Sequence, residues 1–293
     1  MMLFLLPIYF LKDAKEPMQQ MQQVQESTNA CQLFIKVNGV EIEIDDYLIG
    51  VLAGEMPASF HEEALKAQAI AARTYALKKM SQGEKEILST TAHQVYQDQK
   101  LRQEKWKAAF ATNEENLAQA VRQTANQVIT YNGELITAMF HSSSNQTTES
   151  AKNYSGNNIP YLQAVSSPEE NTAQQTFFTF AELNTKLQKK YSTKQYNNVQ
   201  IKRNDTNHVE QITIHNKKWS GREIRELLNL RSTNFTWQAS AKGVTITTYG
   251  YGHGVGMSQN GANTMAGQGS TAQQILAHYY PNTTLKKVNY CEK

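Results

Sequence analysis

The chain has 293 residues, which is enough for one large or two smaller domains with a sizeable core. Apolar residues make up 40% and charged residues 19% of it, as is ordinary for a globular protein. The formal charge of +3 is too small to indicate nucleic-acid binding, and no RNA- or DNA-binding motif is present.

The first eleven residues, MMLFLLPIYFL, are apolar, but a membrane-spanning helix needs about 20 such residues. They also lack the basic start of a signal peptide. Two interpretations remain: an anchor or export signal whose basic start is absent, which we favour, and an apolar tail. Residues 12–30 are polar and rich in glutamine, which indicates a tether without a core of its own.

The two cysteines, Cys31 and Cys291, bracket the part of the chain that has a core pattern. No metal-ligand spacing exists between them. They are either two free thiols or, in an exported protein, a bridge that joins the two ends.

Two hairpins are expected. Residues 33–44 alternate apolar and polar side chains around Asn38-Gly39, which predicts a type I′ turn. Residues 128–144 repeat this pattern around Asn132-Gly133 and run into His141 and a serine cluster.

Between the hairpins, residues 61–80 predict a helix buried in the middle of a domain. Its apolar stripe consists of Leu65, Ala69, Ala72, Ala76 and Met80. The further expected elements are helices over 113–125, 177–191, 222–230 and 271–281, a strand and turn over 209–221, and a strand over 243–249. Because strands and helices mix without regular βαβ alternation, the fold class is predicted to be α+β.

Glu55 stands between Gly54 and Met56-Pro57, just ahead of the alanine-rich helix. We expect Gly54 to allow an unusual backbone angle and Pro57 to stiffen the next turn, which would fix the carboxylate at the mouth of a groove. Apolar neighbours such as Leu52 would raise the pKa of Glu55 and keep it protonated as a general acid. The alternative is a carboxylate that only complements the helix dipole.

Two familiar motifs are excluded. HEEAL is not the zinc-protease motif H-E-x-x-H, because Leu65 stands where the second histidine is needed. The alternating glycines of residues 250–256 do not have the G-x-G-x-x-G spacing of a dinucleotide site. Such glycines let the backbone approach a ligand or another strand closely, with His253, Ser258 and Gln259 directed into the same space; a tight structural corner is the alternative.

Several segments occur in a distinctive order: DDYLIGVLAGEMPASFHEEALKAQAIAARTYAL, HQVYQ, PYLQAV, SGREIRELLNLRS and GHGVGMSQNGANTMAGQGSTAQQILAHYYPNTTL. From residue 31 to the end, the sequence resembles the stage II sporulation protein D family of endospore-forming bacteria. The resemblance implies two lobes around a glycan-binding groove: a catalytic lobe over 31–165, a second lobe over 166–240, and a return to the first over 241–293.

The resemblance also implies a membrane-anchored peptidoglycan lytic transglycosylase that cuts peptide-stripped glycan strands during forespore engulfment. Its catalytic acid falls on Glu55. The implied partners are the sporulation amidase-endopeptidase P and the membrane protein M. The folded part would lie on the cell-wall side of the mother-cell septal membrane.

Ordinary glycosidases use two carboxylates. A transglycosylase manages with one, because the C6 hydroxyl of muramic acid attacks C1 within the same sugar and gives a 1,6-anhydro product. The alternative function is that of a non-catalytic glycan-binding protein that activates a cell-wall amidase.

No cofactor is expected. Some relatives carry a Cys/His zinc cluster around the segment that here reads STTAHQVYQ. This chain keeps His93 but has no cysteine between 32 and 290, so hydrogen bonds are expected to hold that segment in place of a metal.

The expected substrate-binding residues are Lys66, Gln68, Arg73, Tyr75, His141, Ser143, His253, Ser258 and Gln259. Helix geometry places Gln68 and Tyr75 on one face and Lys66 and Arg73 on another, so these four cannot all reach one sugar. Arg73 could instead pair with a carboxylate such as Asp46, and Tyr75 could be part of the core.

Overall fold

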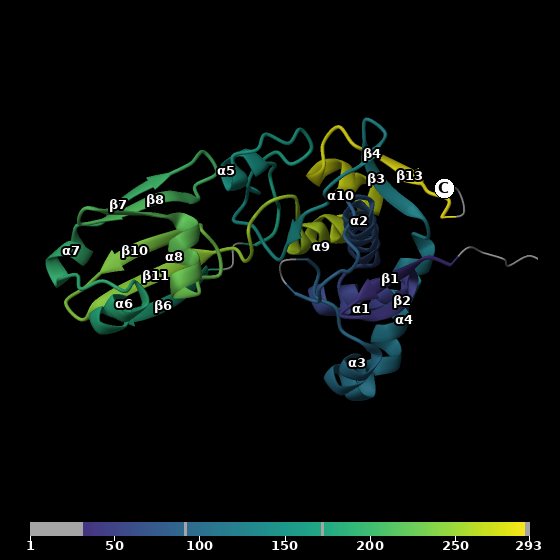
Figure 1. The fold of residues 1–293 in the computed structure, drawn as a ribbon, viewed down its shortest axis with the longest axis horizontal. Helices are drawn as coiled ribbons and strands as arrows, with labels where there is room; N and C mark the ends of the chain where they lie inside the picture. The colour runs from purple at the N-terminus through teal and green to yellow at the C-terminus, as the bar shows by residue number, and fades with distance from the viewer. Residues whose placement is uncertain (1–31, 91–92, 171–172, 291–293) are drawn as a thin grey trace, which may run out of the picture. The chain divides into compact units, whose positions relative to one another are not determined.

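The computed structural model describes residues 32–90, 93–170 and 173–290. Helices mix with strands that form several small sheets, so the predicted α+β class is confirmed (Figure 1). The apolar N-terminus, the tether, Cys31 and Cys291 lie outside the described residues. In the part of the chain that is described, no helix combines the length and the apolar character needed to cross a bilayer.

The helices are α1 (Ile44–Glu55), α2 (Glu62–Ser81), α3 (Gln99–Trp106), the 3₁₀ turn η1 (Lys107–Ala109), α4 (Phe110–Gln123), α5 (Ala151–Ser155), α6 (Phe180–Lys186), α7 (Thr193–Asn197), α8 (Gly221–Leu228), α9 (Gln259–Gly267) and α10 (Ala272–Tyr279). The strands are β1 (Phe34–Val37), β2 (Val40–Glu43), β3 (Gln127–Tyr131), β4 (Glu134–Leu135), β5 (Phe140–His141), β6 (Ala173–Thr179), β7 (Gln200–Arg203), β8 (Val209–Ile214), β9 (Lys217–Ser220), β10 (Phe235–Ala239), β11 (Gly243–Tyr249), β12 (Met257–Ser258) and β13 (Thr284–Lys287).

Both predicted hairpins are confirmed. Strands β1 and β2 pair antiparallel, as do β3 and β4. Asn38 and Gly39 have φ of 46° and 88°, and Asn132 and Gly133 have φ of 50° and 89°. Positive φ at both central residues is the requirement of the type I′ turn, and asparagine followed by glycine meets it with little strain.

Helix α2 is the predicted buried helix, and α1, α4, α9, α10 and β3 pack around it (Figure 1). Its small side chains are buried on nearly every side, which lets these neighbours approach closely. Of the predicted stripe, Met80 is half-buried, and the other four members are fully buried. This packing fixes the helices that carry the candidate site on either side of α2.

The expected helix over 177–191 is wrong in its first turn. Residues 177–179 end strand β6, which pairs antiparallel with β11, and α6 begins only at Phe180. The boundary has a local cause: Thr179 and Glu182 form a capping box, in which each side chain accepts a hydrogen bond from the other residue's backbone.

Side chains from β6, α6, β8, α8, β10 and β11 form a hydrophobic cluster of their own. It packs between the antiparallel sheets β10-β11-β6 and β7-β8-β9 and the short helices beside them (Figure 1). Phe34–Val288 nevertheless form one compact unit. The division into lobes at residues 165 and 240 stays a prediction.

Candidate functional site

Glu55 is the last residue of α1, and its carboxylate is anchored at one oxygen. The backbone N–H of Val95 donates to Glu55 Oε1 over 2.7 Å. Burial raises the pKa of Glu55, and the hydrogen bonds from Val95 and Gln259 offset this only in part. A carboxyl group of this kind holds a proton at a higher pH than an exposed glutamate does.

Gln259, the first residue of α9, faces the same carboxylate. It is 4% exposed, and within the described residues its Nε2 has no hydrogen bond of normal geometry. Gln259 therefore acts on Glu55 through a longer polar contact and keeps donor capacity for another acceptor.

Two glycines of α1 bring the Val95 segment to Glu55. A Cβ on Gly54 would lie 2.5 Å from the Val95 carbonyl oxygen, and one on Gly50 would collide with the Tyr96 ring. The backbone of residues 95–97 thus packs directly on a bare helix surface. The expected unusual backbone angle at Gly54 is wrong: this residue is helical, and its function is close approach.

Glu55 lies where two cavities adjoin, one of about 560 Å³ and one of about 450 Å³, volumes in the range of small-ligand sites. The larger cavity is lined by residues that include Tyr75, His93, Val95, Ser142, His141, Tyr154, Arg225, Tyr251, His253 and Gln259. The smaller one is lined by residues 54–59 together with Lys105, Trp106 and Asn113. Among the described residues that line either cavity, Glu55 is the only carboxylate.

The glycine-rich loop forms part of the wall of the larger cavity. All four glycines at 250, 252, 254 and 256 have positive φ, between 72° and 116°. A Cβ at Gly252 would lie 2.8 Å from His141 Cβ, and one at Gly256 would collide with the Met139 carbonyl oxygen. The expected close approach to another strand is therefore confirmed: β12 pairs parallel with β5, directly after this loop.

Two histidines of the cavity, His141 and His253, are neutral at physiological pH. Burial lowers the pKa of His141 well below its ordinary value, and burial together with the charge of Arg225 lowers the pKa of His253 to about 4. The hydrogen bonds fix their tautomers. His141 Nδ1 donates to the Val255 carbonyl and Nε2 accepts from Ser144, whereas His253 Nδ1 accepts the Val255 N–H.

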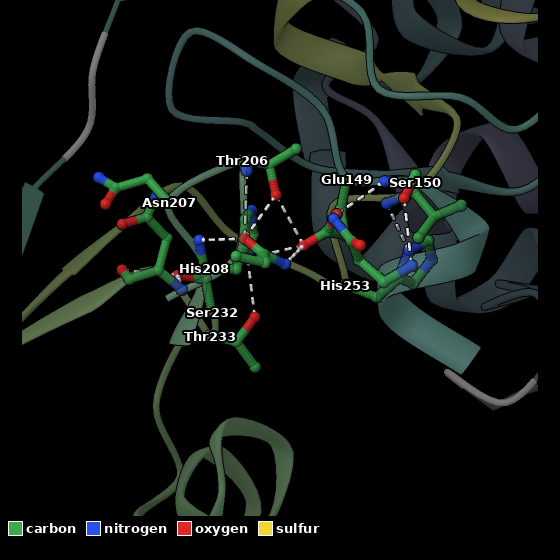
Figure 2. A network of polar contacts seen from close by, with 12 residues as sticks. Glu149, Ser150, Thr206, Asn207, His208, Ser232, Thr233 and His253 are labelled. Atoms are coloured by element: carbon green, nitrogen blue, oxygen red, sulfur yellow. Dashed lines mark hydrogen bonds and ion pairs between the residues drawn. The ribbon is translucent and has the colours of Figure 1, made fainter. Parts of the chain in front are cut away.

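A buried carboxylate, Glu149, holds the loop in place (Figure 2). Its Oε1 accepts from Ser150 N and Asn153 Nδ2 at 2.8 and 2.9 Å, and its Oε2 accepts from Asn204 Nδ2 at 2.7 Å, with the Thr206 hydroxyl at 2.9 Å. Its own N–H donates to the carbonyl of Gly254, the residue after His253. Satisfied buried networks of this kind rigidify their surroundings.

Five of the predicted site residues come together at the larger cavity: Glu55, Tyr75, His141, His253 and Gln259. The other five serve the surrounding framework. Lys66 pairs with Glu62 and Glu63 at 2.9 and 2.8 Å on the side of α2. Gln68 is fully buried, and its amide has no hydrogen-bond partner among the described residues.

Arg73 is fully buried and donates to the carbonyl of Thr124, the C-cap residue of α4, over 2.7 Å. It forms an ion pair with Asp45 at 3.5 Å, so the alternative that Arg73 pairs with a carboxylate is confirmed, at the residue next to Asp46. Ser143 exchanges backbone hydrogen bonds with Tyr251. Ser258 caps α9 and donates to Glu169 over 2.6 Å.

The sequence did not single out Val95, Tyr154, Arg225 and Tyr251 as site residues. Val95 contributes only its backbone N–H, which no side-chain pattern marks. Tyr154 is an isolated tyrosine in a segment without periodicity, and Tyr251 stands between Gly250 and Gly252, where the glycine pattern assigns no role to it. Arg225 had a usable signal, because the short helix α8 carries Arg222 and Arg225 three residues apart, on neighbouring positions of its surface.

The described part of the segment around His93 is held by hydrogen bonds. His93 Nδ1 accepts from the Leu88 N–H at 3.0 Å, and Ser89 Oγ both donates to the Tyr96 carbonyl and accepts from its N–H. Within residues 32–90, 93–170 and 173–290, no cluster of three metal-ligating side chains occurs. The absence of a structural metal stays a prediction.

The chain matches known proteins over most of its length. A family model described as stage II sporulation protein matches residues 30–131. The chain is 38% identical over 259 residues to stage II sporulation protein D of Bacillus amyloliquefaciens, covering 85% of this chain and 75% of that protein. For the protein of the same name from Bacillus subtilis (strain 168), identity is 38% over 259 residues, covering 85% and 76%. The amidase enhancer of Bacillus subtilis (strain 168) is 30% identical over 296 residues, covering 81% of this chain and 40% of that protein.

Proposed function

Because the chain belongs to the stage II sporulation protein D family, we propose that it is a lytic transglycosylase that cuts peptidoglycan glycan strands with Glu55 as its single catalytic acid. The observation that carries the proposal is the cavity itself. It holds one half-buried carboxyl group whose pKa is raised, and no second carboxylate lines it among the described residues. Hydrolysis by a pair of carboxylates has no second group to use there.

The anchoring of Glu55 suits the two proton transfers. Since Oε1 accepts the Val95 N–H, the acidic proton of the neutral carboxyl resides on Oε2. That proton goes to the glycosidic oxygen as the C1–O bond breaks. The carboxylate then takes the proton of the C6 hydroxyl of the same muramic acid as that oxygen bonds to C1, which leaves a 1,6-anhydro end and restores the acid.

Positive charge develops at C1 during this step, and Glu55 is the only carboxylate among the described residues that line the cavity. We propose that the N-acetyl group of the substrate stabilises this positive charge. Gln259, with donor capacity to spare beside the carboxylate, is placed to hold that acetyl oxygen or the sugar hydroxyls.

The test compares the wild-type protein with Glu55→Gln on purified, peptide-stripped glycan strands. Mass spectrometry separates the two chemistries, because an anhydro product is one water lighter than a hydrolysis product. The proposal requires anhydro ends from the wild type and loss of nearly all cleavage in the variant. Hydrolysis products, or cleavage that persists in Glu55→Gln, would refute it.

The cellular setting belongs to the same proposal: septal wall degradation during engulfment, an N-terminal membrane anchor with the folded part facing the wall, and action beside the amidase-endopeptidase P and the membrane protein M. Removal of stem peptides by an amidase would supply the substrate.

A second candidate function is favoured by one comparison, the similarity to a protein named amidase enhancer. On this account the chain binds glycan without cutting it and stimulates a cell-wall amidase in trans. The test measures the turnover of a cell-wall amidase with and without added Glu55→Gln variant. Stimulation by this variant, together with absence of glycan cleavage by the wild type, would favour the second function, since an activator does not need the acid.

A further inference from the structure

One wall of the larger cavity carries a positive charge that the cleavage chemistry does not use. Arg225 lines this cavity together with Tyr154 and Tyr251. Helix α8 fixes its position, because Ile224 and Leu228 on the same helix are buried in the hydrophobic cluster.

Among the residues that the structure describes, Arg225 has no counter-ion at contact distance. Its Nε donates to the Leu230 carbonyl over 3.4 Å, and within the described residues no carboxylate forms an ion pair with it. Glu226 acts on it only at longer range, and burial lowers its pKa. A guanidinium remains charged at neutral pH all the same, so a partly buried cation lines the cavity with no carboxylate paired to it in the described part of the chain.

Two further arginines lie over the rings of tyrosines that line this cavity. The Arg222 guanidinium lies 4.5 Å from the centre of the Tyr154 ring, and that of Arg231 lies 4.7 Å from the centre of the Tyr251 ring. The charges of Arg225 and Arg222 also contribute to lowering the pKa of His253 inside the cavity. Their field therefore reaches the space that a ligand would fill.

A neutral sugar gives such a cation nothing to pair with, whereas a carboxylate does. Muramic acid carries a lactyl ether whose carboxyl group is an amide while the stem peptide is attached and a free carboxylate once the peptide has been removed. We propose that Arg225 binds this lactyl carboxylate, so that the site selects peptide-stripped strands by charge. The inference rests on the proposed glycan substrate. It adds the residue that distinguishes peptide-stripped strands from strands that still carry stem peptides.

The test measures binding without cleavage, in full-length protein carrying Glu55→Gln. Isothermal titration compares two ligands: peptide-stripped glycan strands, and the same strands with each lactyl carboxyl group converted to the methylamide. A bidentate charged contact predicts a preference of about 10- to 100-fold for the carboxylate form.

Two substitutions at the site follow. Arg225→Met keeps the apolar stem of the side chain and removes the charge, and is expected to make the affinities for the two ligands equal. Arg225→Lys keeps the charge without the planar fork, and is expected to retain part of the preference. Arg122→Ala, at an exposed arginine paired with Glu115 on α4, is the control and should keep the full preference.

Equal affinities for both ligands before any change at 225, a preference that survives Arg225→Met, or no measurable binding of either strand would overturn the proposal. The outcome is separable from the cleavage hypothesis. A carboxylate preference that depends on Arg225, in a protein whose wild-type form does not cut glycan, supports the subsite and refutes the transglycosylase. Anhydro products from a protein without that preference support the transglycosylase and refute the carboxylate subsite.

Discussion

The contact between α1 and the Val95 segment can be tested with a single methyl group. In Gly54→Ala the new Cβ would stand 2.5 Å from the Val95 carbonyl oxygen and 3.0 Å from both its carbonyl carbon and Cγ1. Ordinary contact begins at 3.4 Å, so the carbonyl must retreat by about 0.9 Å. Because the same residue donates to Glu55 Oε1 over 2.7 Å, a retreat along that line lengthens the hydrogen bond beyond its limit.

The size of the effect follows from two losses and one gain. Overpacking costs about 1–3 kcal/mol, and a hydrogen bond to a neutral carboxyl group contributes about 0.5–1.5 kcal/mol. Alanine in place of a helical glycine returns up to about 1 kcal/mol. The net destabilisation is about 1–3 kcal/mol, which lowers the melting temperature by roughly 2–5 °C in a chain of this size.

The pH dependence of cleavage separates this effect from a general loss of stability. The Val95 hydrogen bond lowers the pKa of Glu55, so its loss raises that pKa further while the group stays buried. We expect the alkaline limb of the rate profile to shift to higher pH and the maximal rate to fall as the carboxyl group loses its anchor.

Gly267→Ala is the matched control, because this helical glycine of α9 has no atom within 4 Å of the position of a new Cβ. It should melt slightly higher than the wild type and keep the wild-type rate profile. If Gly54→Ala behaves like this control in both measurements, the glycine surface of α1 does not position Glu55 and the account of the site is wrong.

Three further predictions concern charge and metal. Burial raises the pKa of Glu55, so its ionisation costs stability as pH rises above 4.5; Glu55→Gln should therefore melt higher than the wild type at pH 7, with no gain near pH 4. Burial lowers the pKa of His141, His208 and His253, so stability present above about pH 6.5 should be lost as pH falls towards 4. The His253 share is about 3 kcal/mol, and denaturant titrations showing no loss between pH 6.5 and 4 would refute it. Hydrogen bonds hold the described part of the His93 segment, so a strong chelator should leave the melting temperature unchanged; a clear drop would reveal a structural metal.

Local rules predicted the elements whose cause lies within a few residues. Asparagine followed by glycine predicted both hairpins, because the turn itself requires two positive φ angles. The alanine-rich pattern predicted the burial of α2, since helix periodicity and small side chains are visible in the sequence. The misplaced start of α6 has the opposite cause: the apolar residues 177–178 suit a helix as well as a strand, and the pairing with β11 that decides between them is distant in the sequence.

The candidate site was predicted where a motif supplied it and missed where the fold assembled it. Glu55 and the glycine-rich loop are local patterns. Val95 reaches Glu55 only because Gly50 and Gly54 leave α1 bare, and Arg225 reaches the cavity from a helix anchored in another hydrophobic cluster. Proximity of this kind depends on packing between segments that are far apart in the chain. The spacing of residues within one segment does not predict it.

His141 and His253 explain how one cavity can hold both an acid of raised pKa and a cationic wall. A positive charge near Glu55 would lower its pKa and remove the proton that the proposed reaction needs. Burial instead keeps His141 and His253 neutral at physiological pH, and burial and hydrogen bonds, not a cationic side chain, account for the pKa of Glu55. With these two imidazoles neutral, they add no positive charge to that of Arg225. The charge of Arg225 is then available to a substrate carboxylate, while burial keeps the pKa of Glu55 raised.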